Sequence, residues 1–523
     1  MRSWPFNSFQ YGGVLVLQTI IARAILPAIV FNKDLRSQAD RHLRSHTGIF
    51  IDGSFRPGTG KPFDSISPSL GTVLATVQSA SREDVNAAVK AAAKAFKGSW
   101  RGATPSERST LMHKLADLVE RDLSELATLE ALDSGMLFAI ALGGEVPFLV
   151  KALRYYAGLT DKIEGKTLPT SSTPLGTHLA YTYREPVGVC AFVLPYSTPL
   201  MSLGWKVSAA LAVGNTVIIK PSEFTPLTAL RIAALTAEAG FPPGVVNVLT
   251  GDNETGSALA YHPSIALISL TGKEVTGLLQ TAWIPKATND TPASLAGVCL
   301  ELGGKNANIV FADADLKIAV PNAFLSSFMH SGQVCAAGER LFVQAGIYDA
   351  FMEALNAKLD EAVFSDPLHS SNFPFCSGPV INKEPGSEKG AKSRTGKNQQ
   401  SLSNDCYTAN YLITDIKNPK MRFMREEVFG SVVGITKFDT EEQVIELANS
   451  ADQGLHAIIF TEDIRRGHRV ARQLEAGTVL INHSTTPDLP YPFGGHKLSG
   501  WGKDGGMEAL DNYLQTKTII STL

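Results

Sequence analysis

Charged residues and cysteines are both scarce in this chain of 523 residues. Only 19% of the residues are charged, and 47 basic against 50 acidic residues give a net charge of −3. The strongly basic surface of a nucleic-acid-binding protein is therefore not expected, and nucleic acid is not a predicted partner. The cysteines are odd in number and scattered, at Cys190, Cys299, Cys335, Cys376 and Cys406. This pattern argues against a disulfide framework and indicates a reducing compartment.

No cluster of cysteine and histidine has the spacing of metal ligands, so no metal site is predicted. The chain also has few uninterrupted apolar runs. The longest mostly apolar stretch, Tyr11–Phe31, is long enough to span a bilayer, but Arg23 at its centre is costly in lipid and Pro27 would kink a helix. We expect an N-terminal extension over residues 1–48 and a cytoplasmic protein. A mitochondrial location and a membrane anchor through residues 11–31 stay open as alternatives.

Two amphipathic helices are predicted before the first strands of the main sheet. Ser81 and Asp84 form a capping box at the start of the first helix. Thr104 caps the second helix, with Pro105 as its first helical residue. The apolar stripe of the second helix runs through Leu111, Leu115 and Leu118.

From Val187 onward, short apolar runs alternate with helical patterns. The predicted strands are Val187–Leu194, Thr216–Ile219, Val245–Leu249 and Ile265–Leu270. The helices predicted between them are Met201–Ala212, Pro226–Ala239 and Thr255–Tyr261. Buried strands separated by helices are typical of a parallel, doubly wound sheet, so the fold class is α/β. Ligands of such sheets bind beyond the carboxyl ends of the strands.

The loops after these strands carry residues suited to a dinucleotide. Lys220 follows directly after the second strand and Glu223 comes three residues later, a pair that can hydrogen-bond an adenosine ribose. The third strand leads into the loop Gly251–Gly256, and the fourth into the loop Gly272–Gly277, which contains Lys273. A glycine-bounded loop that opens a helix presents backbone N–H groups to a diphosphate. One such loop alone indicates only a turn, but several consecutive strand ends together favour a cofactor site.

Cys335 and Glu301 are the candidate reactive residues. Cys335 is followed by two alanines and a glycine, which leave its sulfur approachable. A nucleophilic thiol needs such access together with a lowered pKa or a nearby base. A lone cysteine is usually a small buried apolar residue and a lone glutamate is usually solvated, so their significance depends on the surrounding motifs.

Those motifs resemble the aldehyde dehydrogenase superfamily from about Phe50 to the C-terminus. They occur in order along the chain: EPVGVCAFVLPY at Glu185, KPSE at Lys220, GFPPGVVNVLTG at Gly240, LTG at Leu270, LELGGKNANIVFADAD at Leu300, GQVC at Gly332, EEVFG at Glu426 and PFGGHKLSGWGKDGG at Pro492. The most specific pair is ELGGK, which contains Glu301, with GQVC, which contains Cys335.

The resemblance implies that the chain oxidises an aldehyde to a carboxylic acid with NAD. Cys335 matches the nucleophile that forms a thiohemiacetal and then a thioester, and Glu301 matches the base that activates water to hydrolyse it. A CoA-acylating dehydrogenase is an alternative, but a hydrolytic base argues against it. A catalytically weakened homologue with a binding role is the second alternative.

The resemblance also assigns the cofactor residues and the domains. Lys220 and Glu223 match the adenosine-ribose contacts, which favours NAD and leaves NADP open, while Glu427 and Phe429 match the contacts to the nicotinamide ribose and ring. The implied parts are a Rossmann-like NAD-binding domain (49–167 and 187–303), an α/β catalytic domain (304–510) and a small β element for oligomerisation (168–186 and 511–523). A homodimer or homotetramer is therefore expected.

Several positions depart from the family pattern. Ser197 stands where an asparagine amide usually stabilises the oxyanion, and loss of such a donor costs roughly 10²–10³ in rate. Lys273 replaces a small hydroxyl residue and is expected to meet the phosphates as a charge. Ser431 replaces a usual proline, and the segment Ser370–Asp405 is expected to be a long loop. The family's substrate-tunnel positions, Thr198, Trp205, Met329 and Pro487, are uncharged and favour an apolar or aromatic aldehyde.

Overall fold

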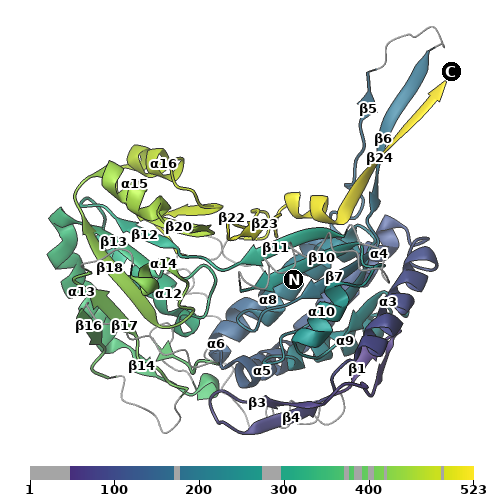
Figure 1. The fold of residues 1–523 in the computed structure, drawn as a ribbon, viewed down its shortest axis with the longest axis horizontal. Coiled ribbons are helices and arrows are strands. Elements are labelled where there is room, and N and C mark those ends of the chain that lie inside the picture. The colour runs from purple at the N-terminus through teal and green to yellow at the C-terminus, as the bar shows by residue number, and fades with distance from the viewer. Residues whose placement is uncertain are drawn as a thin grey trace, which may run out of the picture.

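The computed structural model describes residues 47–169, 177–273, 296–369, 376–381, 392–398, 406–416, 421–484 and 488–522. Nearly all of the N-terminal extension, Gly277, Pro487 and most of the segment 370–405 lie outside the described residues. The chain forms two lobes, each built on a mainly parallel sheet, and an arm that projects from one of them (Figure 1).

The first lobe contains the doubly wound sheet that the sequence predicts. Its strand order is β2-β1-β9-β8-β7-β10-β11-β23, and the five strands from β9 to β11 are parallel. The strands are β1 (Ile49–Ile51), β2 (Ser54–Arg56), β7 (Val189–Val193), β8 (Thr216–Lys220), β9 (Val246–Val248), β10 (Leu267–Gly272), β11 (Gly297–Leu302) and β23 (Gly500–Trp501). The connecting helices are α8 (Pro199–Ala212), α9 (Leu227–Ala239) and α10 (Asn253–Ala260). Every strand and helix predicted between Val187 and Leu270 is confirmed to within two residues at each end.

The two earlier helices begin where their caps predict. Helix α3 (Arg82–Lys97) starts after the capping box of Ser81 and Asp84, and α4 (Pro105–Arg121) starts after Thr104. The apolar stripe predicted on α4 faces the core, with Leu115 buried and Leu111 and Leu118 half-buried against the same cluster. Helix α4 packs against both α7 (Val146–Ala157) and α9, so its buried face also takes in Met112, Ala116 and Val119.

The second lobe has a seven-stranded sheet in the order β16-β17-β18-β13-β12-β20-β21. All its pairs are parallel except β16 with β17. Its strands are β12 (Ala307–Val310), β13 (Arg340–Gln344), β16 (Lys392–Thr395), β17 (Tyr411–Thr414), β18 (Val432–Phe438), β20 (His456–Phe460) and β21 (Thr478–Ile481). Its main helices are α12 (Leu316–Phe328), α13 (Tyr348–Glu361), α15 (Glu441–Asn449) and α16 (Ile464–Ala471).

Strand β16 corrects the expectation that Ser370–Asp405 is one long loop. Its sequence, Lys392–Thr395, is polar and lacks the apolar alternation that signals a strand. It is an edge strand, and Arg394 ties it to α13 by donating to Asp360 Oδ2 at 2.8 Å. A strand held by hydrogen bonds and an ion pair leaves no hydrophobic pattern in the sequence.

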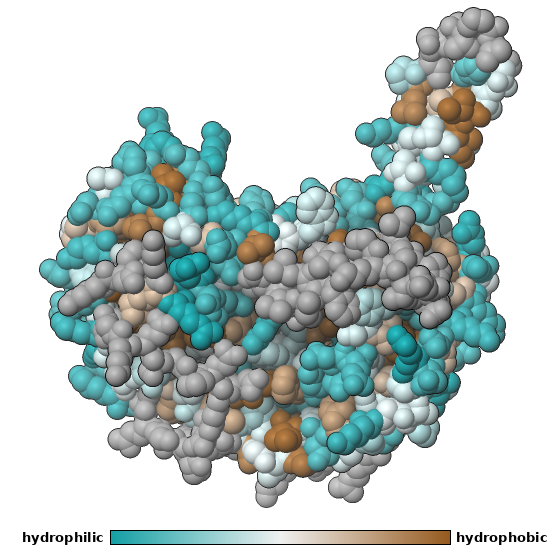
Figure 2. All heavy atoms as spheres, viewed as in Figure 1, coloured by the Kyte–Doolittle hydropathy of each residue, from teal (hydrophilic) through white to brown (hydrophobic). Residues whose placement is uncertain are grey.

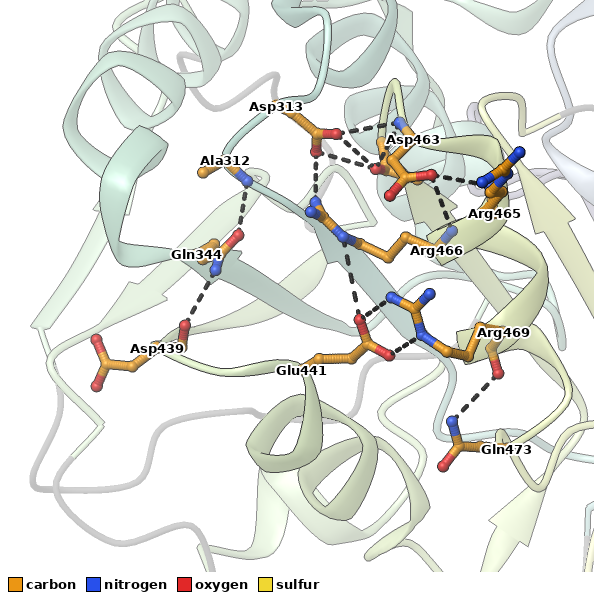
Figure 3. A network of polar contacts seen from close by, with 11 residues as sticks. Ala312, Asp313, Gln344, Asp439, Glu441, Asp463, Arg465, Arg466, Arg469 and Gln473 are labelled. Atoms are coloured by element: carbon orange, nitrogen blue, oxygen red, sulfur yellow. Dashed lines mark hydrogen bonds and ion pairs between the residues drawn. The ribbon is translucent and has the colours of Figure 1, made fainter.

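An ion-pair network holds the outer helices of the second lobe (Figure 3). Arg469 donates from two nitrogens to the two carboxylate oxygens of Glu441, both at 2.7 Å, and so ties α16 to α15. Arg466 donates to Asp313 at 2.9 Å, just beyond the end of β12. The network is partly exposed, so it orients the helices more than it stabilises the fold.

The arm is a three-stranded antiparallel sheet in the order β24-β6-β5 (Figure 1). It is formed by β5 (Thr167–Leu168), β6 (His178–Pro186) and β24 (Leu514–Thr522), and β24 pairs with β6 along its whole length. Apolar residues gather on the arm (Figure 2), and the exposed ones are Leu179, Tyr181, Tyr183 and Ile520.

The smaller elements of the two lobes are β3 (Phe63–Ile66), β4 (Val73–Val77), α5 (Leu123–Ser134), α6 (Phe138–Ile140), β14 (Val363–Phe364), β15 (Cys376–Ser377), α14 (Arg422–Arg425), β19 (Gln453–Gly454) and β22 (His496–Lys497).

Candidate active site

Cys335 lies half-buried in the turn between α12 and β13. Its backbone carbonyl accepts a hydrogen bond from Asn306 Nδ2 at 2.7 Å, and the same amide donates to the carbonyl of Ala337 at 2.9 Å. Asn306 Oδ1 in turn accepts from the backbone N–H of His456 at 2.9 Å. One asparagine therefore fixes the cysteine turn to the start of β20. The sequence motifs contain Asn306, but no role for it was predicted.

The backbone that leads into Cys335 is strained. His330, Ser331 and Gly332 are consecutive left-handed residues, with φ of 50°, 57° and 74°. Such conformations are costly for residues other than glycine and persist only where the surroundings impose them. Here Ser331 Oγ donates to the carbonyl of Gly378 at 2.8 Å, and a side chain at Gly332 would collide with the carbonyl of Gly430.

Glu301 is a buried carboxyl on β11, with 3% of its surface exposed. Neither of its carboxylate oxygens has a hydrogen-bond partner among the described residues. Gly494, with φ of 154°, leaves room for it, since a side chain there would reach Glu301 Oε1 at 2.5 Å. Burial, and then the charge of Asp504, raise the pKa of Glu301 well above its usual value. A carboxyl whose pKa is raised towards neutrality is suited to general-base chemistry.

A buried ion pair adjoins Glu301. Lys206 on α8 is fully buried and its Nζ lies 2.8 Å from Asp504 Oδ2 and 2.9 Å from Ser269 Oγ. The charge of Asp504 raises the pKa of Glu301, and the charge of Lys206 lowers it. Neither residue was predicted to belong to the site. The one signal in the sequence was a lysine inside an otherwise apolar predicted helix.

The thiol of Cys335 has a raised pKa of about 12, first because of burial and then because of the charges of Glu427 and Glu301. A lowered pKa is therefore not what the folded chain supplies. Glu427 and Glu301 are the carboxyls whose charges act on the sulfur.

Apolar and aromatic side chains pack around Cys335. Trp205 and Phe493 stack with ring centroids 5.3 Å apart, and Phe148 meets Trp205 edge-on at 5.0 Å. Met201, Leu455 and Leu489 complete this cluster, against which Cys335 packs. Of the predicted tunnel residues, Trp205 belongs to the cluster, while Thr198 and Met329 are half-buried.

The ends of the parallel strands hold the predicted cofactor residues. Lys220 ends β8 and is buried, with its Nζ 3.3 Å from Glu223 Oε2. Burial lowers the pKa of Lys220, and Glu223 opposes that shift. Gly251, with φ of 154°, precedes α10, while Gly256 in that helix faces open space, with no heavy atom within 4 Å of the place of a side chain.

Glu427 and Phe429 come to the same edge from the second lobe. Glu427 Oε1 accepts from the Gly304 N–H at 3.1 Å, and a side chain at Gly303 would collide with its other oxygen. The ring of Phe429 lies edge-on to Tyr196, with centroids 5.7 Å apart. The turn after Glu301 therefore also seats the Glu427 carboxylate.

Glu339 fixes this second-lobe loop and was not predicted. It accepts from the backbone N–H groups of Val428 at 3.0 Å and Phe429 at 2.8 Å. It also forms a buried ion pair with Lys305. The buried Lys305–Glu339 pair thereby helps to set the position of Phe429, whose φ of 54° is itself strained.

Ser197 is buried in the loop between β7 and α8, next to Tyr196. Among the described residues, no hydrogen bond joins Ser197 to Cys335 or to Glu301.

Gly272 ends β10 and Lys273 follows it at the same edge of the sheet. Within the described part of the chain, no three metal-ligating side chains come together.

This edge of the sheet fits a dinucleotide. It combines a buried amine paired with a carboxylate at Lys220, open space over Gly256 and a glycine at the end of β10. A buried carboxyl without partners, Glu301, lies near the cysteine. The fold and the site together define a two-lobed α/β oxidoreductase with its cysteine between the lobes.

Comparison with known proteins gives the family. The family model for the "Aldehyde dehydrogenase family" matches residues 55–519. The aldehyde dehydrogenase of Alternaria alternata is 40% identical over 487 residues, covering 90% of this chain and 95% of that protein. The cytosolic aldehyde dehydrogenase 1 of Rattus norvegicus is 41% identical over 488 residues, covering 91% and 94%. The NAD⁺ complex of the Bacillus cereus aldehyde dehydrogenase superposes with a TM-score of 0.87 at 39% identity, covering 93% and 98%.

The chain belongs to the aldehyde dehydrogenase family. These matches confirm the prediction, made from the motifs, of an NAD-dependent aldehyde dehydrogenase with an α/β fold.

Proposed function

We propose that this chain hydrolytically oxidises an aldehyde with NAD, with Cys335 as nucleophile and Glu301 as the base that activates water. The observation that carries this proposal is the Glu301 carboxyl, buried, without a partner, and near enough for its charge to act on the Cys335 thiol. Nothing in a structural role requires an unpartnered buried carboxyl, which costs stability.

The chain's own residues perform the covalent steps. The Cys335 thiol gives its proton to solvent, and its sulfur adds to the aldehyde carbon, which leaves the negative charge on the former carbonyl oxygen. When that oxyanion collapses, the carbon loses a hydride and a thioester remains on the sulfur. Glu301 then removes a proton from water, whose oxygen attacks the thioester carbon, and the C–S bond breaks to release the acid and the thiolate.

NAD, when bound, supplies the hydride acceptor. Lys220 and Glu223 would hold its adenosine ribose, the Gly251, Gly256 and Gly272 positions its phosphates and adenine, and Glu427 and Phe429 its nicotinamide end. Glu223 is an acceptor for a free 2′-hydroxyl and repels a 2′-phosphate, so NAD is preferred to NADP. Gly277 belongs to the same expected loop but lies outside the described residues.

The substrate class follows from the surroundings of Cys335. Trp205, Phe493 and Phe148 present aromatic surface, and the rest of the cluster is aliphatic or thioether. An apolar or aromatic aldehyde therefore gains more from this site than one that carries a carboxylate.

A catalytically weakened homologue with a binding role is the second candidate, and Ser197 is the observation that favours it. It takes the place at which the resemblance expects an asparagine amide for the oxyanion. The Cys335 backbone N–H then carries most of that charge. A CoA-acylating enzyme is disfavoured by a buried base suited to activating water.

The projecting arm supports a homodimer or homotetramer. Exposed Leu179, Tyr181, Tyr183 and Ile520 on a three-stranded sheet form an apolar surface that a second copy can cover.

No helix among the described residues is long and apolar enough to cross a bilayer, and the stretch 11–31 is not among them. We propose a cytoplasmic location, with a mitochondrial one or an anchor at residues 11–31 as alternatives. The domain boundaries given above are proposed with it.

An aldehyde panel tests the proposed function. The purified protein is assayed by nicotinamide absorbance with aliphatic, aromatic and carboxylate-bearing aldehydes, with NAD and with NADP, in the presence and absence of CoA. We expect NADH formation without CoA, fastest with apolar or aromatic aldehydes. Strict dependence on CoA would establish the acylating alternative, and NAD binding without turnover of any aldehyde would establish the binding role.

A further inference from the structure

Two buried glutamates cap the first turn of helix α8. Within the described residues, the N-cap residue Thr198 makes no side-chain hydrogen bond to the backbone of that turn. Instead, the N–H of Leu200 donates to Glu130 Oε1 at 3.4 Å. The N–H of Met201 donates to Glu145 Oε2 at 2.9 Å. The first N–H groups of a helix have no partner inside the helix, so these two carboxyls supply what the helix itself lacks.

The two glutamates come from different segments of the first lobe, and both are buried. Glu130 lies on α5, whereas Glu145 ends a π-helical turn, η2 (Ala141–Glu145), that leads directly into α7. Turns of this kind are rare and often occur at functional sites. The side chains of Glu130 and Glu145 are 1% and 2% exposed, and Glu130 Oε2 has no hydrogen-bond partner among the described residues. Burying such a carboxyl costs stability, so a purely structural cap does not account for the pair.

The helices that these caps join carry two sides of the aromatic cluster. Met201 and Trp205 lie one turn apart on α8, and Phe148 lies on α7, three residues after Glu145. Trp205 meets Phe148 edge-on at 5.0 Å, and Cys335 packs against the same cluster. The hydrogen bond between Glu145 and the Met201 N–H therefore fixes the α8 side of the cluster relative to the α7 side.

We propose that Glu130 and Glu145 are positioning residues that set the spacing of the aromatic cluster beside Cys335, and with it the preference for aromatic over small aldehydes. The inference rests on the proposed function, in which this cluster receives the aldehyde. A shift of the first turn of α8 moves Trp205 relative to Phe148, and a bulky aldehyde contacts more of that surface than a small one does. Binding of a bulky aldehyde therefore depends on the two caps more than the chemistry at Cys335 does.

The same pair makes this preference depend on pH. Burial raises the pKa of Glu145 to about 8, and the Met201 N–H acts in the opposite direction. Burial and then the charge of Glu145 raise the pKa of Glu130, and the charge of Asp133 adds to that shift. Two carboxyls that interact in this way titrate as a pair, so both are charged only in alkaline solution. Their repulsion then acts between α5, η2 and the start of α8, and the fit to an aromatic aldehyde is expected to worsen as the pH rises through about 8.

Michaelis constants for benzaldehyde and acetaldehyde at pH 7 test the role of the caps. Glu145→Leu removes the acceptor and keeps a side chain of similar size, so the KM for benzaldehyde should rise about tenfold, as expected for loss of a buried hydrogen bond. The KM for acetaldehyde, and kcat for both aldehydes, should change less than about threefold. Glu145→Gln keeps an acceptor for the Met201 N–H and should restore the KM of the wild type. Glu353→Gln, at an exposed position on α13, is the control for loss of a charge and should change neither KM.

The pH dependence tests the inference even if Glu145→Leu does not fold. The wild type and Glu145→Gln are assayed at pH 7 and pH 9, and the KM for benzaldehyde is divided by the KM for acetaldehyde, because Cys335 and Glu301 act on both aldehydes alike. This ratio should rise several-fold at pH 9 in the wild type and stay constant in Glu145→Gln. Equal increases of both KM values in Glu145→Leu, or the same pH dependence of the ratio in Glu145→Gln as in the wild type, would overturn the inference. Failure of the wild type to oxidise either aldehyde would instead overturn the proposed function.

Discussion

Asp504→Asn removes one of the three charges that act on Glu301, the others being Lys206 and Lys503. In the folded chain Asp504 raises the pKa of Glu301 and Lys206 lowers it, with Asp504 the larger influence. The variant removes the negative charge and leaves Lys206 buried with Glu301 as the nearest carboxyl to neutralise it. The pKa of Glu301 should therefore fall, by roughly one to three units for a neighbouring charge of this kind.

The fall has two consequences for the reaction. The acid limb of the pH profile for thioester hydrolysis should move to lower pH, since Glu301 is ionised over a wider range. The plateau rate should also drop, because a weaker base removes the proton of water less effectively. Breaking the buried Lys206–Asp504 pair, 2.8 Å long with both side chains at most 2% exposed, is expected to cost about 3–5 kcal/mol of stability. Because Lys206 can partly re-pair with Glu301, we expect the loss of stability to lie near the lower end of this range.

Single-turnover rapid-quench measurements of acyl-enzyme decay between pH 5 and pH 9 give the profile directly. Thermal unfolding in the same buffers shows that the variant is folded. Asp452→Asn is the matched control, because Asp452 is exposed and pairs only distantly with Arg425, at 3.9 Å. An acid limb in folded Asp504→Asn that coincides with that of the wild type would refute the placement of Glu301 beside this ion pair.

Three further predictions address the cofactor, the oxyanion and the buried acids. Glu223→Ser should reduce the preference of kcat/KM for NAD over NADP, because the residue no longer repels a 2′-phosphate; an unchanged cofactor ratio would remove Glu223 from the ribose site. Ser197→Asn should raise kcat/KM about tenfold to a hundredfold if a weak oxyanion donor limits the rate; lower values for every aldehyde, with NAD still bound, would reject that account. Glu145 is buried with a pKa raised to about 8, so the folded chain keeps a proton that the unfolded chain loses above its ordinary value of 4.5. Stability should therefore fall as pH rises from about 4.5 to 8, by up to about 1.4 kcal/mol per pH unit for this group, and Glu145→Gln should flatten the dependence of Tm on pH.

The parallel sheet was predictable because its strands are buried on both faces. Runs such as Val217–Ile219 and Leu267–Leu270 are almost wholly apolar, and in the helices between them the apolar residues recur with helical periodicity. Strand β16 was not predictable, since an edge strand held by Arg394 and Asp360 shows no such pattern. The apolar stripe of α4 was predictable, but Met112, Ala116 and Val119 are also buried because α4 packs against several helices at once.

The proposed reactive pair, Cys335 and Glu301, comes from the sequence motifs, whereas the residues that contact its surroundings were not predicted. Each of these residues contacts a partner far away in the sequence. Asn306 donates to the backbone carbonyl of Cys335, Glu339 accepts from two backbone N–H groups, and Asp504 pairs with the buried Lys206. Contacts of this kind join segments that are far apart in the sequence and meet only in the folded chain, so local sequence patterns do not reveal them. The raised pKa of the Cys335 thiol is likewise a property of burial in the folded chain.

Mass spectrometry of the acyl-enzyme tests the central claim most directly. Glu301→Gln is mixed with NAD and an aromatic aldehyde, quenched in acid within one turnover, and digested for peptide mapping. We predict a burst of NADH equal to the enzyme concentration, with an acyl group on Cys335 that persists far longer than in the wild type. An acyl group on another residue, or steady-state turnover of the variant at the wild-type rate, would contradict the assignment of Cys335 as nucleophile and Glu301 as the hydrolytic base.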